Sequence, residues 1–145
     1  MALPFLHDNT VSRRRLEALA RHLSDEDLLR STPDGWTVAA LFAHLAFWDR
    51  RVFVLLLRWK EKGVDPSPID ADALNDALKP LCLALDPRTA VRLCPSSADA
   101  ADAELSTIGS ELIERIQASP THFRFNRALH RNDHLDQIEL LLQTP

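Results

Sequence analysis

Residues 35–51 read GWTVAALFAHLAFWDRR and open the longest segment in which apolar residues recur at a helical period. The apolar row of this segment advances by three or four residues and consists of Leu41, His44, Trp48, Val52, Leu55 and Trp59. Residues at that spacing share one face of an α-helix. The segment therefore predicts a long helix from Thr37 to about Lys62, with Thr37 as N-cap and Gly63 as the stop. A histidine lies in the middle of its core-facing row.

The rest of the chain is also helical in character. It has only three glycines and no tyrosine in 145 residues, and no useful length alternates apolar and polar residues as a strand does. We expect an all-α fold, a four-helix bundle with short accessory helices, in a single domain over residues 1–145. The expected helices cover about residues 8–23, 37–62, 70–85, 87–108 and 126–143, with short ones starting at Ser24 and Ser110.

Local signals set several of these boundaries. Asp86-Pro87 is a strong helix start, with aspartate at the N-cap and proline at the first helical position. Asn126 is the expected N-cap of the last helix. Pro80 and Pro95 fall inside expected helices and should bend or split them. The expected inward rows are Leu16, Leu19, Ala20 and Leu23, and Ala90, Cys94, Ala98, Ala101, Leu105 and Ile108. Leu74, Leu78, Leu81 and Leu85 are expected on one side of their helix.

Charge and cysteine content narrow the possible partners. A net charge of −4 gives no support to nucleic-acid binding. The basic groups Arg13–Arg15 and Arg124, Arg127 and Arg131 are interpreted as solvated helix faces. The apolar run Val52–Leu57 is far too short to span a membrane, so no membrane partner is expected. Without a signal segment, Cys82 and Cys94 are expected to be buried free thiols of a cytoplasmic protein.

Two histidines four residues apart occupy one face of the last helix. His130 and His134 share that face with Ile138 and Leu141. A pair at this spacing can direct both imidazoles at one metal ion, as in other helical sites. Buried histidines satisfied by hydrogen bonds are the competing interpretation, and the pair alone does not decide between them.

His44 strengthens the metal interpretation. Three neutral imidazoles in an apolar bundle are costly to bury unless their nitrogens find partners, and one divalent ion would satisfy all three. The predicted metal ligands are therefore His44, His130 and His134. Three protein ligands leave a position open for water or substrate, as in catalytic sites, and three imidazoles suit Zn, Ni or Fe. His7 before the first helix, His22 at its end and His122 in a loop are interpreted as solvated or capping residues.

These residues resemble a known family. Gly35-Trp36-Thr37, Ala43-His44-Leu45 and Trp48-Asp49-x-Arg51 look like the second-helix signature of the DinB/YfiT-like superfamily. His130-x-x-x-His134-x-x-Gln137-Ile138 looks like its last-helix motif, and the ending Asp133–Ile138 is most similar to the ClbS/DfsB-type subgroup. The resemblance covers nearly the whole chain in helix order, although its specific residues are confined to these two segments.

The resemblance implies an up-down-down-up bundle, often a homodimer, with a three-histidine divalent metal site. Members include transferases and isomerases that use a low-molecular-weight thiol such as mycothiol, bacillithiol or glutathione, metal-dependent hydrolases, and resistance proteins that act on reactive small molecules. This chain departs from the pattern at Ala40, where an acidic residue is usual, and at Pro95.

Three functions remain open from the sequence. The first is a metal-dependent enzyme acting on a small molecule, in which Asp49 and Asp133 either orient a histidine or are surface charges. The second is a binding or sequestration protein whose pocket has an aromatic wall of Trp36, Phe47, Trp48 and Trp59. The third is a dimeric helical protein whose histidines only pack. Cys94 is expected to pack rather than to react, and no general base can be named.

Overall fold

The computed structural model describes residues 3–144, which contain seven helices and no strand. The helices are α1 (Pro4–His22), α2 (Asp25–Leu29), α3 (Val38–Lys62), α4 (Ala71–Ala84), α5 (Pro87–Ser106), α6 (Ser110–Gln117) and α7 (Ala128–Gln143). None of these helices is both long enough and apolar enough to cross a membrane. The predicted all-α class is confirmed.

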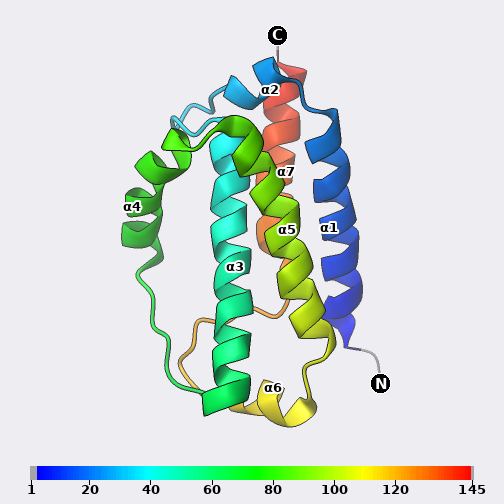
Figure 1. Ribbon diagram of the computed structural model, residues 1–145, viewed down its shortest axis with the longest axis vertical. Helices are drawn as coiled ribbons and strands as arrows, with labels where there is room; N and C mark the ends of the chain where they lie inside the picture. The colour runs from blue at the N-terminus through cyan, green and yellow to red at the C-terminus, as the bar shows by residue number, and fades with distance from the viewer. Residues whose placement is uncertain (1–2, 145) are drawn as a thin grey trace.

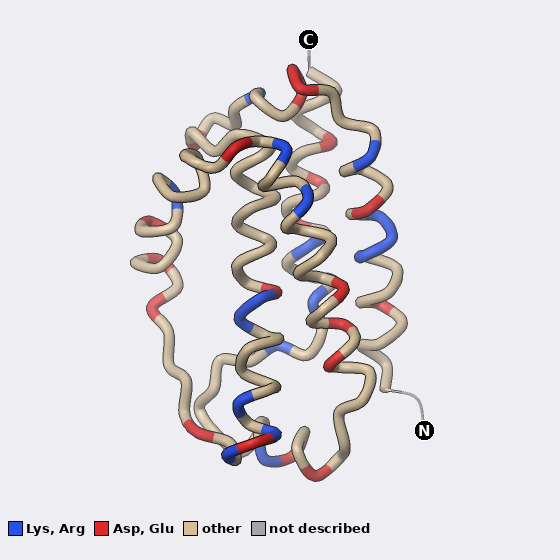
Figure 2. The backbone as a smooth tube through the Cα atoms, viewed as in Figure 1, with Lys and Arg blue, Asp and Glu red and all other residues tan. Residues whose placement is uncertain are grey.

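Four of the helices form the bundle. In Figure 1, α1 and α7 run upward while α3 and α5 run downward, which is the predicted up-down-down-up order. The short helix α2 lies at one end of the bundle and α6 at the other, and α4 flanks α3 on the outside. Lys and Arg are interspersed with Asp and Glu along the chain (Figure 2), so no helix is uniformly basic.

Helix α3 is the central element of the core. The Thr37 hydroxyl accepts a hydrogen bond from the backbone N–H of Ala40 at 3.0 Å, and Gly63 ends the helix with a φ of 89°. That left-handed conformation is easy only for glycine. All residues from 38 to 46 are buried, so this half of α3 is enclosed on every side. Helix α5 packs against it through the predicted row from Ala90 to Ile108, all of which is buried.

Several helix boundaries and faces differ from the sequence prediction. Helix α1 begins at Pro4, because proline is well tolerated in the first helical turn, and His7 therefore lies inside the helix. Helix α5 ends at Ser106 rather than Ile108. Pro80 does not split α4, and Pro95 lies inside α5 as the sequence predicted.

The apolar side of α4 is only partly buried. Leu81 is 66% exposed and Leu85 is 39% exposed, and Cys82 is the buried residue of this helix. Periodicity identifies the apolar face of a helix, but α4 lies outside the four-helix core (Figure 1) and packs mainly on α3, so part of that face stays uncovered.

A buried ion-pair network ties α7 to its neighbours, and it corrects the interpretation of Arg127 and Arg131 as solvated residues. Arg131 is fully buried; its Nε donates to Asp49 Oδ2 at 2.9 Å, and its Nη2 donates to Asp102 Oδ1 at 2.8 Å. Arg127 Nε donates to the other oxygen of Asp49 at 2.8 Å. Buried charges are tolerated when they are paired and hydrogen-bonded in this way.

Helix α1 joins the same network through Asn9. The Asn9 carbonyl accepts a hydrogen bond from Arg131 Nη1 at 3.1 Å, and its side-chain oxygen accepts one from the Arg127 backbone N–H. The predicted N-cap of α7 is one residue early: Arg127 is the N-cap residue, and the Asn126 side chain still accepts a hydrogen bond from the N–H of Ala128. The four bundle helices thus meet at one polar cluster.

We expect Asp49→Asn to lower the free energy of unfolding by about 3 kcal/mol. Arg127 would lose its carboxylate partner, and Arg131 would keep only its ion pair with Asp102. Urea denaturation followed by circular dichroism measures the change. Asp133→Asn, on the exposed face of α7, is the matched control and should alter stability by less than about 0.5 kcal/mol. Equal stabilities of the two variants would contradict this account of the network.

Candidate metal centre

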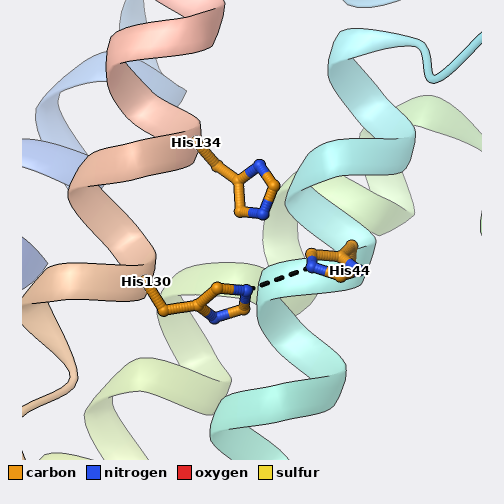
Figure 3. A group of neighbouring side chains, drawn as sticks. All are labelled: His44, His130 and His134. Carbon is orange, nitrogen blue, oxygen red and sulfur yellow. Dashed lines mark hydrogen bonds between the residues drawn. The ribbon is translucent and has the colours of Figure 1, made fainter. Parts of the chain in front are cut away.

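The three predicted ligands meet between α3 and α7 in the bundle (Figure 3). His44 projects from α3 toward His130 and His134 on α7 (Figure 3), and the Nε2 atoms of His44 and His130 share a hydrogen bond at 3.1 Å. One ligand nitrogen from each of the three histidines lies within 4.8 Å of the others. Residues 86 and 90 positions apart in the sequence therefore form one cluster.

The polar network decides which way α7 faces. Arg127 and Arg131 are held on Asp49 and Asp102, so the turns that carry them are fixed against α3 and α5. His130 lies between these two arginines in sequence, and His134 follows one turn later on the same face. Fixing the arginines therefore fixes the direction of both histidines.

His44 lies in a nearly dry environment between two tryptophans. Its ring centroid is 5.3 Å from that of Trp36 and 6.5 Å from that of Trp48, both in edge-on arrangements. The side chain is buried, and its Nδ1 has no hydrogen-bond partner among residues 3–144. A buried ring nitrogen without a partner carries an energetic cost, so protein hydrogen bonds alone do not satisfy this histidine.

Burial favours the neutral form of the cluster. Desolvation, followed by the charge of His134, lowers the pKa of His44 to about 4. Desolvation also lowers the pKa of His130 to about 2, with smaller effects from His134, His44, Arg127 and Arg124. Neutral imidazole is the form that binds a metal, so these two residues are ready to ligate at pH 7 without first losing a proton.

Gln137 orients the third histidine. Its side-chain oxygen lies 3.1 Å from His134 Nδ1. An amide oxygen can only accept, so His134 Nδ1 carries the proton and its Nε2 has a free lone pair. Metal-binding histidines commonly have such a partner on the nitrogen that does not ligate. The sequence prediction gave Gln137 no role, although its position three residues after His134 places it on the same helix face.

The donor set fits a divalent cation. Zinc–imidazole bonds of about 2.0–2.1 Å separate neighbouring ligand nitrogens by about 3.0–3.4 Å. The His44–His130 separation of 3.1 Å already falls in that range, and a nitrogen of His134 lies within 4.8 Å of both. Three neutral imidazoles suit Zn, Ni or Fe alike, so the residues fit a metal without selecting one.

An open cleft of about 410 Å³ adjoins the cluster. His130 and Trp48 form its inner wall, and Asn75 fixes the tryptophan by accepting a hydrogen bond from its Nε1 at 3.1 Å. The remaining lining residues are Arg51, Val52, Ile69, Ala71, His122, Phe123, Arg124 and Arg127. A cavity of this size suits a small molecule.

Several other candidates lie away from the histidines. Asp49 is buried, but it pairs with arginines rather than with a histidine, and Asp133 is exposed. Trp59 packs against Phe123 at 5.3 Å between centroids, in the part of the core that includes Ile116 of α6. It therefore does not belong to an aromatic wall at the site. Phe47 packs edge-on against Trp48, at 5.2 Å between centroids, and is not part of the cleft lining. Cys94 is fully buried, and desolvation raises the pKa of its thiol.

The other three histidines are separate from the cluster. His7 and His22 are exposed on α1, and His22 Nδ1 contacts the carbonyl of Ala18. His122 is exposed in the loop before α7 and has a φ of 51°, but it also lines the cleft. That position was missed because the sequence does not show where a loop folds back.

The metal-free protein should lose stability as the pH falls from 7 to 5. The folded pKa values of His44 and His130 lie below the unfolded value of about 6.5, so below that pH the unfolded chain takes up more protons than the folded one. The expected loss is on the order of 1 kcal/mol or more per histidine. Urea denaturation after chelation at several pH values measures it. The double variant His44→Gln, His130→Gln should show a shallower pH dependence, and an equal slope would contradict the assignment.

Comparison with known proteins places the chain in a family. No curated protein and no solved structure shows significant similarity to it. The family model of the DinB superfamily, however, matches residues 9–140, which span the bundle from α1 into α7 and include all three histidines. The chain belongs to the DinB superfamily.

Proposed function

We propose that the histidine cluster binds one divalent metal ion and that the protein is a metal-dependent enzyme acting on a small molecule. The observation that carries this proposal is the convergence of His44, His130 and His134 beside an open cleft. Buried histidines that only pack would not need a donor set aimed at one point. The reaction class that we propose is thiol-dependent transfer or isomerisation, or hydrolysis.

The roles of the chain's own residues follow from their positions. His44, His130 and His134 would hold the ion, and Gln137 would keep His134 Nε2 free to ligate. A bound divalent ion supplies Lewis acidity and lowers the pKa of a water or thiol. Trp36 and Trp48 exclude water from the side of His44. Three protein ligands leave coordination free for an incoming molecule, and the cleft provides the access.

A binding or sequestration protein of the ClbS type is the second candidate. The observation that favours it is the lining of the cleft, which includes no carboxylate among the described residues that could act as a general base. The indole of Trp48 and the ring of Phe123 offer apolar surface for a ligand there. The ending Asp133–Ile138 supports membership of the ClbS/DfsB-type subgroup. Turnover of a thiol and electrophile panel by the metal-loaded protein would argue against pure sequestration.

We expect protein purified without chelator to contain about one divalent ion per chain. The double variant His44→Ala, His134→Ala should lose that ion because it removes two of the three ligands. Inductively coupled plasma mass spectrometry measures the content, with circular dichroism to verify the fold, and His7→Ala is the control on an exposed histidine. A folded wild type that neither holds nor rebinds metal at pH 7 would overturn the enzyme proposal in favour of the second candidate.

Gln137→Leu should weaken metal binding by about 10- to 100-fold, because His134 loses the partner that selects its tautomer and orientation. Competition with a chromophoric chelator measures the dissociation constant. Gln143→Leu, an exposed glutamine at the end of the same helix, should bind metal as tightly as wild type. Unchanged affinity in Gln137→Leu would mean that the contact with His134 has no part in ligation.

A further inference from the structure

The charged groups that line the cleft beside the histidines are all basic. Arg51, Arg124 and Arg127 contribute to its wall, together with His122 and His130. Within residues 3–144, no aspartate or glutamate lines it. The nearby Asp70 is at the start of α4, where its side chain accepts a hydrogen bond from the N–H of Ala73. The cleft is therefore locally basic in a chain whose overall charge is −4.

Arg51 is held in place although no carboxylate among residues 3–144 pairs with it. Its Nη2 donates to the Ser67 carbonyl at 3.1 Å, to the Ser67 hydroxyl at 2.8 Å and to the Thr121 carbonyl at 3.2 Å. All three acceptors are uncharged, and the side chain is half-buried. Burial and then the charge of Arg127 lower the pKa of Arg51, as expected of a cation that lacks an anion nearby. The guanidinium is therefore fixed in direction and retains its charge.

The other two arginines differ in how far they are compensated. Arg127 shares the carboxylate of Asp49 with Arg131, so its charge is partly matched inside the protein. Arg124 is exposed and forms no ion pair with the part of the chain that the structure describes. Its side chain nevertheless lines the same cleft as His130, which brings its charge to the site. Arg51 and Arg124 are thus the arginines of the cleft that have no carboxylate partner among residues 3–144.

We propose that the ligand of this cleft is a small organic anion whose carboxylate is received by Arg51 and Arg124 while its reacting group lies at the histidines. The proposal deepens the proposed function and rests on it. Arginine presents a planar fork of donors that matches a carboxylate, and such charge-assisted hydrogen bonds are the strong ones. The cleft volume of about 410 Å³ fits a small molecule rather than a polyanion.

A matched pair of thiols tests the charge requirement. N-acetylcysteine carries a carboxylate, and N-acetylcysteine amide has the same thiol and nearly the same shape without the charge. Isothermal titration calorimetry of the zinc-loaded protein should show at least about tenfold tighter binding of the acid. The preference should shrink at high salt, because part of it is an interaction between exposed charges. Inorganic phosphate, titrated alone into the zinc-loaded protein, should bind more weakly than the acid.

Variants locate the carboxylate. Arg51→Gln and Arg124→Gln should each reduce the preference for the acid by threefold or more, whereas Arg14→Gln, an exposed residue of α1, makes the same charge change and should retain it. Arg124→Gln removes no hydrogen bond within the described protein, so it remains informative if Arg51→Gln disturbs the loops at Ser67 and Thr121.

The outcomes separate this inference from the proposed function. Equal affinity for acid and amide in zinc-loaded wild type, or a preference retained by both cleft variants, overturns the anion proposal and leaves the metal site standing. Phosphate binding as tight as that of the acid would mean a generic anion site and would also overturn it. Failure to load zinc at all is the separate failure of the proposed function.

Discussion

The buried pairing of Arg131 with Asp49 and Asp102 is the constraint on which the bundle and the histidine cluster both depend. Arg131 is fully enclosed and bridges α7 to α3 and α5, while the Asn9 carbonyl adds α1. Breaking a buried pair leaves a charge without compensation, so only one register of α7 against its neighbours satisfies all the partners. A helix with weakly segregated apolar residues is therefore held by polar contacts rather than by an apolar stripe alone.

That register is also what brings the imidazoles together. His130 and His134 lie among the residues that the network orients, and His44 lies five residues before Asp49 on α3. The same contact that stabilises the fold thus sets the spacing of the donor atoms. Two neutral, largely buried imidazoles and a ring nitrogen without a partner are unfavourable in a protein held together only by packing. A cation received at the Nε2 atoms would give the burial of these imidazoles a functional reason, while Nδ1 of His44 would still lack a partner.

Predictions from the sequence were correct where a local signal sets the end of a helix or its buried face. Thr37 and Gly63 mark the ends of α3, because a side-chain cap and a left-handed glycine act within one turn. Asp86-Pro87 starts α5 for the same reason, and the small-residue row from Ala90 to Ile108 is buried as its period indicates. Leu81 and Leu85 belong to an apolar row but are exposed, because such a row does not reveal whether another element covers it. The prediction that Arg127 and Arg131 are solvated was wrong, because arginines are usually exposed and the buried partners of these two are distant in the sequence.

The amino-acid sequence by itself determined the helices, their order and the three histidines that share apolar faces, because caps, breakers and a period of 3.6 residues are local properties. Only the tertiary structure decided that Asp49 serves arginines and not a histidine, that Gln137 orients His134, and that Arg51, Arg124 and His122 surround one cleft. Those relations depend on the rotation and register of helices and on the path of two loops. Long-range packing sets these features, and no spacing along the chain encodes them.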